Sequence, residues 1–312
     1  MTPQQNKTST SKADNPHLWE GLLHLFVVYL VWGSTYLAIR IAVREGSGFP
    51  PFLMAACRTT IGGIVLLVWA KLRGDRLKLN SHEVLLLVIT GSMLWIGGNG
   101  IVNWSEQRIH SALAALLVAS TPLWVAAIES ILDRRTPSRV FIGSLLMGFC
   151  GTGFLSYPVL ASGIHADIIS VLALFLASLS WGGGSLVQRR KGIHLSARVT
   201  AGYQQIFVIP GFLLLAYVTG EPLPAPQPSA WMAFFYLVVF GSVLAIFSFT
   251  RALQLLPTKV VFTYSYVNPM IALFLGWIIL SEPITSWTII GALMIVLGVV
   301  GVFREGQQKR SI

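Results

Sequence analysis

The sequence predicts an all-α integral membrane protein, with ten transmembrane helices arranged as two inverted five-helix repeats. Three observations lead to this prediction. The 312-residue chain is 54% hydrophobic and only 11% charged, which leaves too few charges to cover the surface of a soluble protein of this size. The apolar residues come in runs of about twenty, long enough to cross a bilayer as helices. Short fragments also recur at a nearly constant separation along the chain.

The recurring fragments place the start of a second copy of the membrane unit near residue 166. Trp32 is followed by Gly, and by Leu and Arg further along the helix, and Trp181 has the same followers at the same spacing. The other recurring fragments are Gly91-Ser92 with Gly241-Ser242, and Pro122 with Pro269. Because each copy has an odd number of helices, the second copy enters the membrane from the opposite face, so the repeats are inverted.

Ten apolar segments, joined mostly by short loops, account for most of the chain. They run over residues 21–43, 50–71, 83–105, 109–131, 138–157, 166–187, 197–218, 230–251, 258–281 and 285–303. The predicted domains are a disordered tail at 1–20, a first repeat at 21–157, a second repeat at 166–303 and a tail at 304–312. Pro51, Pro137 and Pro283 stand at the starts of segments, where a helix does not need the N–H that proline lacks. The proline-rich stretch 219–229 is expected to be stiff and extended.

Basic residues gather on one side of the predicted membrane. Most of the 22 Lys and Arg lie in the two tails and in the loops after segments two, four, six and eight. The other side holds only Arg44 and Arg108. This asymmetry predicts that both termini are cytoplasmic, in a multi-pass protein of the cell inner membrane. It also explains the net charge of +10 without a nucleic-acid partner.

Inverted repeats are typical of secondary transporters, in which the substrate site lies near the membrane midplane between the halves. A receptor, a membrane enzyme or a scaffold has no particular need of this symmetry. The sequence therefore favours a carrier that works by alternating access.

Several short motifs add a family resemblance to this prediction. They are Trp32-Gly33-Ser34-Thr35-Tyr36, Arg58, Gly98-Asn99-Gly100, Glu106, Ser111-Ala112-Leu113-Ala114-Ala115, Ser120-Thr121-Pro122, Ser180-Trp181-Gly182, Tyr264-Ser265-Tyr266-Val267-Asn268-Pro269, Glu282-Pro283 and Gly291. Together they make the chain resemble the drug/metabolite transporter superfamily, and within it the EamA family of ten-helix carriers. The resemblance implies cytoplasmic termini and transport of small metabolites. The best-known bacterial branch of the family exports amino acids and related compounds.

Arg58 is the deepest charge in the predicted membrane, within the second segment. A charge at that depth costs about 3 kcal/mol or more, and usually marks a transport pathway or an internal partner. One interpretation is that Arg58 binds a substrate carboxylate, which its planar fork fits. The other is that it is an internal strut bonded to backbone carbonyls. At the same depth the second repeat offers the uncharged polar groups of Tyr203 and Gln205.

Other candidates come from helical spacing and from the prolines. Trp32, Tyr36 and Arg40 share one helix face; the rings either pack or line a pocket, and Arg40, like Arg189, is expected to reach lipid headgroups. Two asparagines one turn apart either bond between helices or contact substrate. The repeated prolines are expected to break helices and free carbonyls. The full predicted site is Arg58, Trp32, Tyr36, Asn99, Asn103, Thr121, Pro122, Trp181, Tyr203, Gln205, Tyr264, Asn268 and Pro269.

Several kinds of chemistry have no support in the sequence. The acidic residues, Glu106 among them, lie at or near segment ends, which weighs against proton coupling. The histidines have no metal-ligand spacing, and there is no P-loop or nucleophile elbow, so no enzyme, cofactor or metal site is expected. Cys57 and Cys150 lie within apolar segments and are predicted to be small buried residues.

The sequence as a whole predicts a secondary transporter that exports small metabolites, with amino acids, including apolar and aromatic ones, as the best match. The expected partners are a small-molecule substrate and the lipid bilayer, and the expected state is a monomer. Two alternatives stay open: a multidrug or nucleotide-sugar carrier, and a membrane receptor or scaffold that does not transport.

Overall fold

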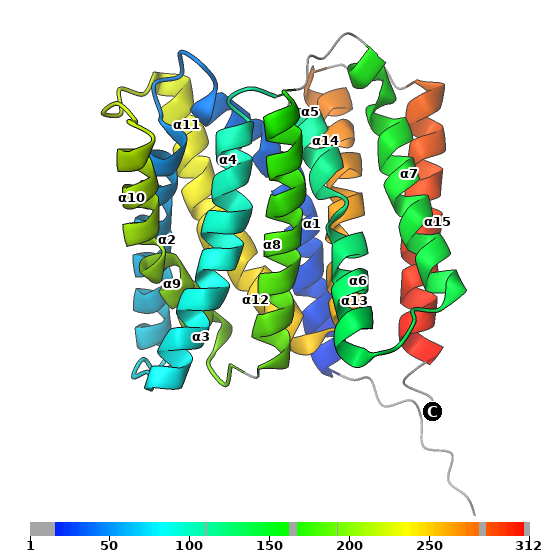
Figure 1. Ribbon diagram of the computed structural model, residues 1–312, viewed down its shortest axis with the longest axis horizontal. Coiled ribbons are helices and arrows are strands. Elements are labelled where there is room, and N and C mark those ends of the chain that lie inside the picture. The colour runs from blue at the N-terminus through cyan, green and yellow to red at the C-terminus, as the bar shows by residue number, and fades with distance from the viewer. Residues whose placement is uncertain (1–15, 110, 162–166, 192, 281–284, 309–312) are drawn as a thin grey trace, which may run out of the picture.

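The computed structural model describes residues 16–109, 111–161, 167–191, 193–280 and 285–308, and this part of the chain is helical, with no strands. Nine helical stretches within it are long and apolar enough to cross a membrane. The helices lie side by side as a bundle (Figure 1). The predicted segment 258–281 is helical as two consecutive helices, and its last residue lies outside the described part. Glu282 and Pro283 also lie outside it.

The first half of the chain contributes helices α1 to α7. Their bounds are α1 Pro16–Val43, α2 Pro51–Leu72, α3 Ser81–Gly91, η1 Ser92–Gly100, α4 Ile101–Ser105, α5 Ser111–Val118, α6 Thr121–Asp133 and α7 Arg139–Ala161. The second half contributes α8 Ile168–Arg190, α9 Ala197–Phe207, α10 Ile209–Val218, α11 Pro228–Tyr236, η2 Leu237–Ala245, α12 Ile246–Leu255, α13 Thr258–Val261, α14 Tyr264–Leu280 and α15 Ser286–Gln308. Both terminal helices extend beyond the apolar segments predicted for them.

The helix starts follow from local sequence. The Asn80 side chain accepts a hydrogen bond from the backbone of Glu83, and the Glu83 carboxylate accepts one from the backbone of Asn80, which forms a capping box for α3. Asp167 and Ser196 cap α8 and α9 in the same way, with side-chain oxygens that accept from the first turn. Pro51 opens α2, as predicted.

Two long helices contain a widened segment at related positions. The π-helical segments η1 and η2 each span nine residues and interrupt the third and eighth predicted segments. π-helical turns are rare and often occur at functional sites, because they displace side chains from regular helical positions. Here they bring Asn99 and Ser242 towards the interior of the bundle.

The repeated prolines differ in their effect on the chain. The fourth predicted segment is broken between α5 and α6, and Pro122 lies in the first turn of α6. Pro269 instead lies inside the continuous helix α14, and the break on that side comes earlier, between α13 and α14. The expectation of a helix broken at each proline therefore holds at Pro122 and is wrong at Pro269.

The proline-rich loop 219–227 packs against the beginning of α2. The Glu221 carboxylate accepts hydrogen bonds from the backbone N–H groups of Phe52 and Leu53, at 2.9 Å each. Ala225 donates to the carbonyl of Gly48, which has φ +82°. A side chain at Gly48 would collide with this loop, because a Cβ there would lie 2.0 Å from the Ala225 carbonyl oxygen.

Large apolar side chains cover the outside of the bundle, as expected for a protein surrounded by lipid. Leu172, Leu214 and Leu293 are all more than half exposed. Cys57 and Cys150 are also exposed. The prediction that these two cysteines are buried is therefore wrong, since an apolar segment has an outward face as well as a packed one.

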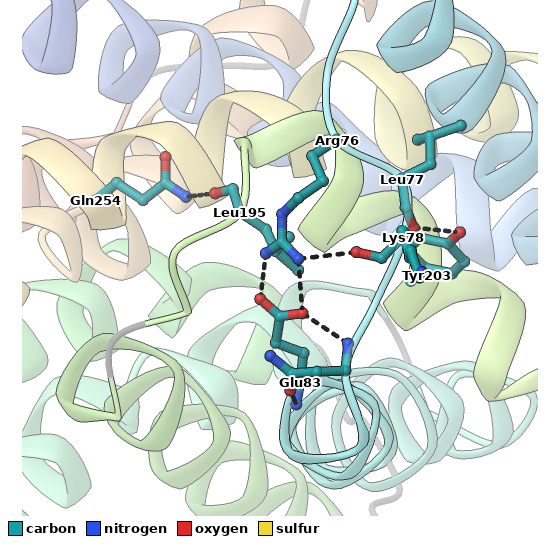
Figure 2. Close-up of polar contacts among 8 residues, drawn as sticks. Arg76, Leu77, Lys78, Glu83, Leu195, Tyr203 and Gln254 are labelled. Atoms are coloured by element: carbon teal, nitrogen blue, oxygen red, sulfur yellow. Dashed lines mark hydrogen bonds and ion pairs between the residues drawn. The ribbon is translucent and has the colours of Figure 1, made fainter.

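The end of the bundle where α1 begins and α15 ends, the lower end in Figure 1, is fastened by ion pairs. Figure 2 shows Arg76 paired with Glu83. It also shows the Gln254 side chain, which donates to the backbone carbonyl of Leu195 at 3.1 Å. Three further pairs join elements distant in sequence, and they are Asp75 with Arg198, Asp133 with Arg190, and Glu20 with Arg251.

Candidate substrate cavity

A cavity lies inside the bundle, lined by residues of α1, α2, η1, α4, α5, α8, α12 and α14. Its volume is about 70 Å³. Arg58 is the one charged side chain among the described residues that line it, and the rest of the wall is aromatic, apolar or uncharged polar. An enclosed, mostly apolar site with a few polar groups is the usual form of a small-molecule site.

Aromatic rings form one wall of the cavity. The rings of Trp32 and Trp181 meet edge to face, with centroids 5.3 Å apart. Tyr264 lies against Trp32 at 4.8 Å, and Phe249 packs on Trp32 at 5.0 Å and on Trp181 at 5.5 Å. The two tryptophans of the recurring fragment are therefore in direct contact, although one belongs to α1 and the other to α8.

Arg58 connects the two π-helical segments. Its Nε donates to the hydroxyl of Ser242 in η2 at 2.6 Å, and Nη1 donates to Oδ1 of Asn99 in η1 at 3.4 Å. The guanidinium also lies over the Trp95 ring, 5.5 Å from its centroid. These hydrogen bonds use two of the five N–H donors of an arginine. Neutral groups therefore hold the side chain in place, and its positive charge remains available to a ligand.

Other polar groups converge near this cation. The indole N–H of Trp95 has no hydrogen-bond partner within the described residues, although the side chain is only 1% exposed. A buried donor without a partner costs about 1–3 kcal/mol, so a ligand that accepts this hydrogen bond removes that cost. Across the cavity, we assign the Asn268 amide the orientation in which its nitrogen donates to the carbonyls of Tyr264 and Tyr29, at 3.0 and 3.3 Å.

The structure brings seven of the predicted site residues to the cavity wall: Trp32, Tyr36, Arg58, Asn99, Trp181, Tyr264 and Asn268. Asn103 and Gln205 lie behind this wall. Asn103 donates to Asn99 at 3.3 Å, and Gln205 donates to the backbone carbonyl of Ser242 at 3.0 Å. Both therefore support residues that hold Arg58.

The other four predicted residues do not line the cavity. Thr121 and Pro122 lie in the first turn of α6, where the Thr121 hydroxyl donates to the carbonyl of Val118. Pro269 follows Asn268 along α14. Tyr203 lies at the lower end, where its hydroxyl donates to the Leu77 carbonyl at 3.0 Å (Figure 2).

The sequence interpretation missed several lining residues, including Thr35, Ile39, Trp95, Gly98, Val102 and Ser178. A signal for them existed in the helical spacing. Residues 32, 35, 36 and 39 of α1 recur at the i, i+3, i+4 and i+7 positions of one helix face, and residues 95, 98, 99 and 102 repeat that spacing. Helical spacing from Trp32, Tyr36 and Asn99 therefore predicts the other lining residues on the same two helix faces.

Two arginines that are expected to reach lipid headgroups also bind protein carbonyls. Arg40 of α1 donates to the backbone carbonyl of Glu106, and Arg189 of α8 donates to that of Gln254 at 2.8 Å. Each joins its helix to a neighbouring segment. Position near a helix end does not reveal which backbone groups lie alongside, so these contacts could not be predicted from the sequence, and the expected contact with headgroups stays a prediction.

A wider hollow of about 910 Å³ lies between η1, α6 and α8. Its walls carry apolar side chains such as Met93, Ile128 and Leu179, and Arg190 and Lys191 lie at one end. It lacks the converging polar groups of the first cavity, which is therefore the candidate substrate site.

Comparison with known proteins places this architecture in a family. The model of the EamA-like transporter family matches residues 19–157 and matches again at residues 168–304. The chain belongs to the EamA-like transporter family. The resemblance found in the sequence motifs is thereby confirmed, and two matches cover most of this EamA-like protein.

Individual relatives are also described as transporters. The chain is 32% identical over 275 residues to YedA of Escherichia coli K12, an uncharacterized inner membrane transporter, with 86% of this chain and 87% of YedA covered. It is 22% identical to YoaV of Bacillus subtilis, an uncharacterized transporter, with 89% and 94% covered. A third relative, 21% identical with 90% and 92% covered, is the S-adenosylmethionine/S-adenosylhomocysteine transporter of Chlamydia muridarum.

One solved crystal structure resembles this EamA-like protein closely in fold. The superposition has a TM-score of 0.73 and covers 91% of this chain and 98% of the other, at 22% identity. At that identity the similarity establishes the shared fold alone.

Proposed function

We propose that this EamA-like transporter exports amino acids, including apolar and aromatic ones, across the cell inner membrane by alternating access through the cavity at Arg58. In this proposal the protein is a monomer with ten transmembrane helices, both termini are cytoplasmic, and residues 21–157 and 166–303 form inverted repeats. Movements of one repeat against the other open the cavity to each side of the membrane in turn.

The cavity wall is the observation that carries the substrate class. It presents one guanidinium with free donors, the unpartnered indole N–H of Trp95, and a set of aromatic rings around Trp32. A carboxylate matches the guanidinium in charge and in fork geometry. An apolar or aromatic side chain matches the rings. An amino acid carries both features in one molecule.

Contacts between repeat-related residues support the inverted arrangement. Trp32 and Trp181 touch, as described above. Gly241 of η2 packs against the Arg58 guanidinium, and its counterpart Gly91 packs against the backbone of Gln204, the neighbour of Gln205. Glycines at related places in the two repeats thus lie against residues at or next to the related positions 58 and 205, as a two-fold relation between the repeats would produce.

The alternatives fit the cavity less well. A cationic drug would meet the positive charge of Arg58, and a nucleotide sugar carries more negative charge than one arginine balances. The two compounds named for the Chlamydia muridarum relative each contain an α-amino and an α-carboxylate group, which favours amino-acid chemistry. A receptor or scaffold that does not transport would bind a ligand without moving it.

Counterflow into proteoliposomes tests the proposed function. Proteoliposomes that contain the purified full-length protein are loaded with unlabelled L-phenylalanine. Uptake of radiolabelled phenylalanine or leucine is then compared with uptake of phenylalanine methyl ester, ethidium and a nucleotide sugar. We expect uptake of the free amino acids and little uptake of the ester, because the ester lacks the carboxylate. Transport of ethidium or the nucleotide sugar in place of the amino acids would contradict the proposal, and binding without transport would favour the receptor alternative.

Variants of Arg58 test the assignment of the site. Arg58→Gln removes a charged hydrogen bond, and we expect it to lower phenylalanine counterflow about tenfold or more. Arg58→Lys keeps the charge but loses the fork, so its loss should be smaller. Exposed Arg108→Gln is the control, expected within about twofold of the parent. Monodisperse Arg58→Gln protein with parental counterflow would exclude Arg58 from the site, and an aggregated variant would favour the strut interpretation.

A further inference from the structure

Glu106, which directly follows α4, is a buried acid that the proposed substrate contacts do not use. Its side chain is 0% exposed, and both carboxyl oxygens lack a hydrogen-bond partner within the described residues. Glu106 does lie at a segment end, as the sequence analysis stated, but the end is packed inside the protein. Its position at a segment end therefore does not indicate that the carboxylate is exposed to water.

The cationic neighbour of Glu106 does not hydrogen-bond its carboxylate, although its charge opposes the rise in pKa that burial causes. Arg40 of α1 donates to the backbone carbonyl of Glu106, not to its carboxylate. Two other polar atoms nearby, the Ser105 hydroxyl and Oδ1 of Asn103, are also buried without partners in the described part of the chain. A charged carboxylate without hydrogen bonds is strongly disfavoured away from water. Burial accordingly raises the pKa of Glu106 well above its usual value.

Glu106 is connected to the cavity through α1. Tyr36, one turn before Arg40, lines the cavity and lies close enough to Glu106 and to Tyr264 of α14 to interact electrostatically with both. Further titratable or charged groups on the elements around it include Arg58 on α2, Asp167 at the start of α8, and Arg108 on the following loop. Charged groups at the opposite ends of α1 and α8, such as Glu20 and Arg190, belong to the ion pairs of the lower end. His110 lies outside the described residues, and η1 has no charged residue.

We propose that Glu106 is the proton-binding site of this carrier. It is protonated in a closed arrangement, in which α1 and the end of α4 pack together and bury it as they do here, and ionised when they separate and admit water. This rests on the proposed transport function. The step is proton transfer alone: the carboxyl O–H bond breaks, the proton passes to water, and the electron pair stays on the carboxylate. Re-protonation reverses it, so one proton binds and leaves in each cycle.

The sign of the pH effect follows from burial. The closed arrangement binds the proton more tightly than an open, hydrated one, so acid favours closure and alkali favours opening. A proton entering from the outer face while an amino acid leaves would couple export to the proton gradient. The neutral, closely isosteric Glu106→Gln would hold the site in its protonated form.

Counterflow and gradient-driven transport separate the two proposals. Proteoliposomes containing phenylalanine are held at about pH 7.5 inside and about pH 5.5 outside, a range that spans ordinary and raised carboxyl pKa values. We expect the gradient to accelerate phenylalanine efflux by the parent protein and by the control Glu129→Gln. Glu106→Gln should lose this acceleration and keep counterflow within about threefold, because exchange needs no net proton movement. If the gradient does not accelerate efflux by the parent protein, or still accelerates efflux by Glu106→Gln, the proton-site proposal is wrong. Either result leaves the proposal of amino-acid transport intact.

A second measurement tests for protonation of Glu106 in the absence of substrate. Tryptophan fluorescence of the detergent-purified full chain, titrated from about pH 5 to about pH 9, should show a transition in the parent and in Glu129→Gln that is missing in Glu106→Gln. Glu106→Asp keeps an ionisable group, so it should retain a transition with a shifted midpoint even if the glutamine variant does not fold. A transition that persists unchanged in Glu106→Gln, or is absent from both the parent and Glu106→Asp, contradicts the proposal. Absent counterflow with an intact transition would reject amino-acid transport alone.

Discussion

Individual charges in this protein are stabilised in two different ways. Arg58 is held by the neutral side chains of Ser242 and Asn99, with no carboxylate partner in the described part of the chain. Asp75, at the lower end, is instead paired with Arg198 through two hydrogen bonds of 2.8 and 3.1 Å, and it accepts a third from Ser196 at 2.7 Å. The first arrangement leaves charge available to a ligand, whereas the second uses it to fasten α9 to the loop after α2.

The Asp75 pair gives a prediction about stability and pH. The hydrogen bond from Arg198, aided by Ser196, holds the pKa of Asp75 below its usual value. Its stabilisation is therefore present above the unfolded pKa of about 3.9 and is lost as the pH falls through the folded pKa. We expect Asp75→Asn to lower the free energy of unfolding by about 1–2 kcal/mol at neutral pH. Thermal unfolding in detergent, followed by circular dichroism, measures this.

The more exposed pair of Asp133 with Arg190 supplies a control, because solvent screens it more strongly. Asp133→Asn should shift the unfolding temperature less than Asp75→Asn does. The Asp75→Asn deficit should also shrink as the sample is acidified. Equal deficits for the two variants, or an Asp75→Asn deficit unchanged in acid, would show that the Arg198 pair does not stabilise the fold.

At the scale of elements, α7 and α15 pack together through glycines. A Cβ built on Gly151 of α7 would lie 2.8 Å from the Gly291 carbonyl oxygen and 2.9 Å from the backbone nitrogen of Ile295. Figure 1 shows the two helices side by side at one edge of the bundle. Small residues allow such close backbone approach, which provides packing between helices that lipid cannot replace.

Two glycines on α7 allow a matched test of this packing. Gly151→Ala must push α15 away, because the atoms it meets belong to backbone, and we expect a loss of about 1–3 kcal/mol. A Cβ on Gly153 meets nothing within 4 Å, so Gly153→Ala should be neutral or stabilise the helix by up to about 1 kcal/mol. The midpoint of thermal unfolding of the two purified variants gives the comparison. Similar midpoints would mean that the helix contact is looser than these distances indicate.

At the scale of the whole molecule, the two ends of the bundle differ in chemistry. The lower end carries ion pairs and the loops rich in Lys and Arg, whereas the opposite end carries the proline-rich loop 219–227 (Figure 1). The positive-inside rule predicts that the lower end faces the cytoplasm. The proposed export direction and the outer position of Glu106 both depend on this assignment.

Cysteine labelling tests the orientation. Leu223 is 89% exposed in the proline-rich loop, and Lys78 is exposed in the loop before α3. In a chain with Cys57→Ser and Cys150→Ser, a membrane-impermeant maleimide should label Leu223→Cys in intact spheroplasts. Lys78→Cys should react only after lysis. The reverse pattern would place the termini outside and would also invert the proposed direction of transport.

The sequence by itself determined where the apolar segments lie, which loops are basic, and which family the chain resembles. These properties depend on local composition and on position along a helix. The tertiary structure decided which way each helix face points. Trp32, Tyr36 and Asn99 face the cavity, whereas Tyr203, predicted at the depth of Arg58, reaches the backbone of Leu77. Cys57 faces outwards, and Glu106 is enclosed at a segment end that looked solvated. Position along a helix can be read from residue number, but rotation about the helix axis is set by packing against helices distant in sequence.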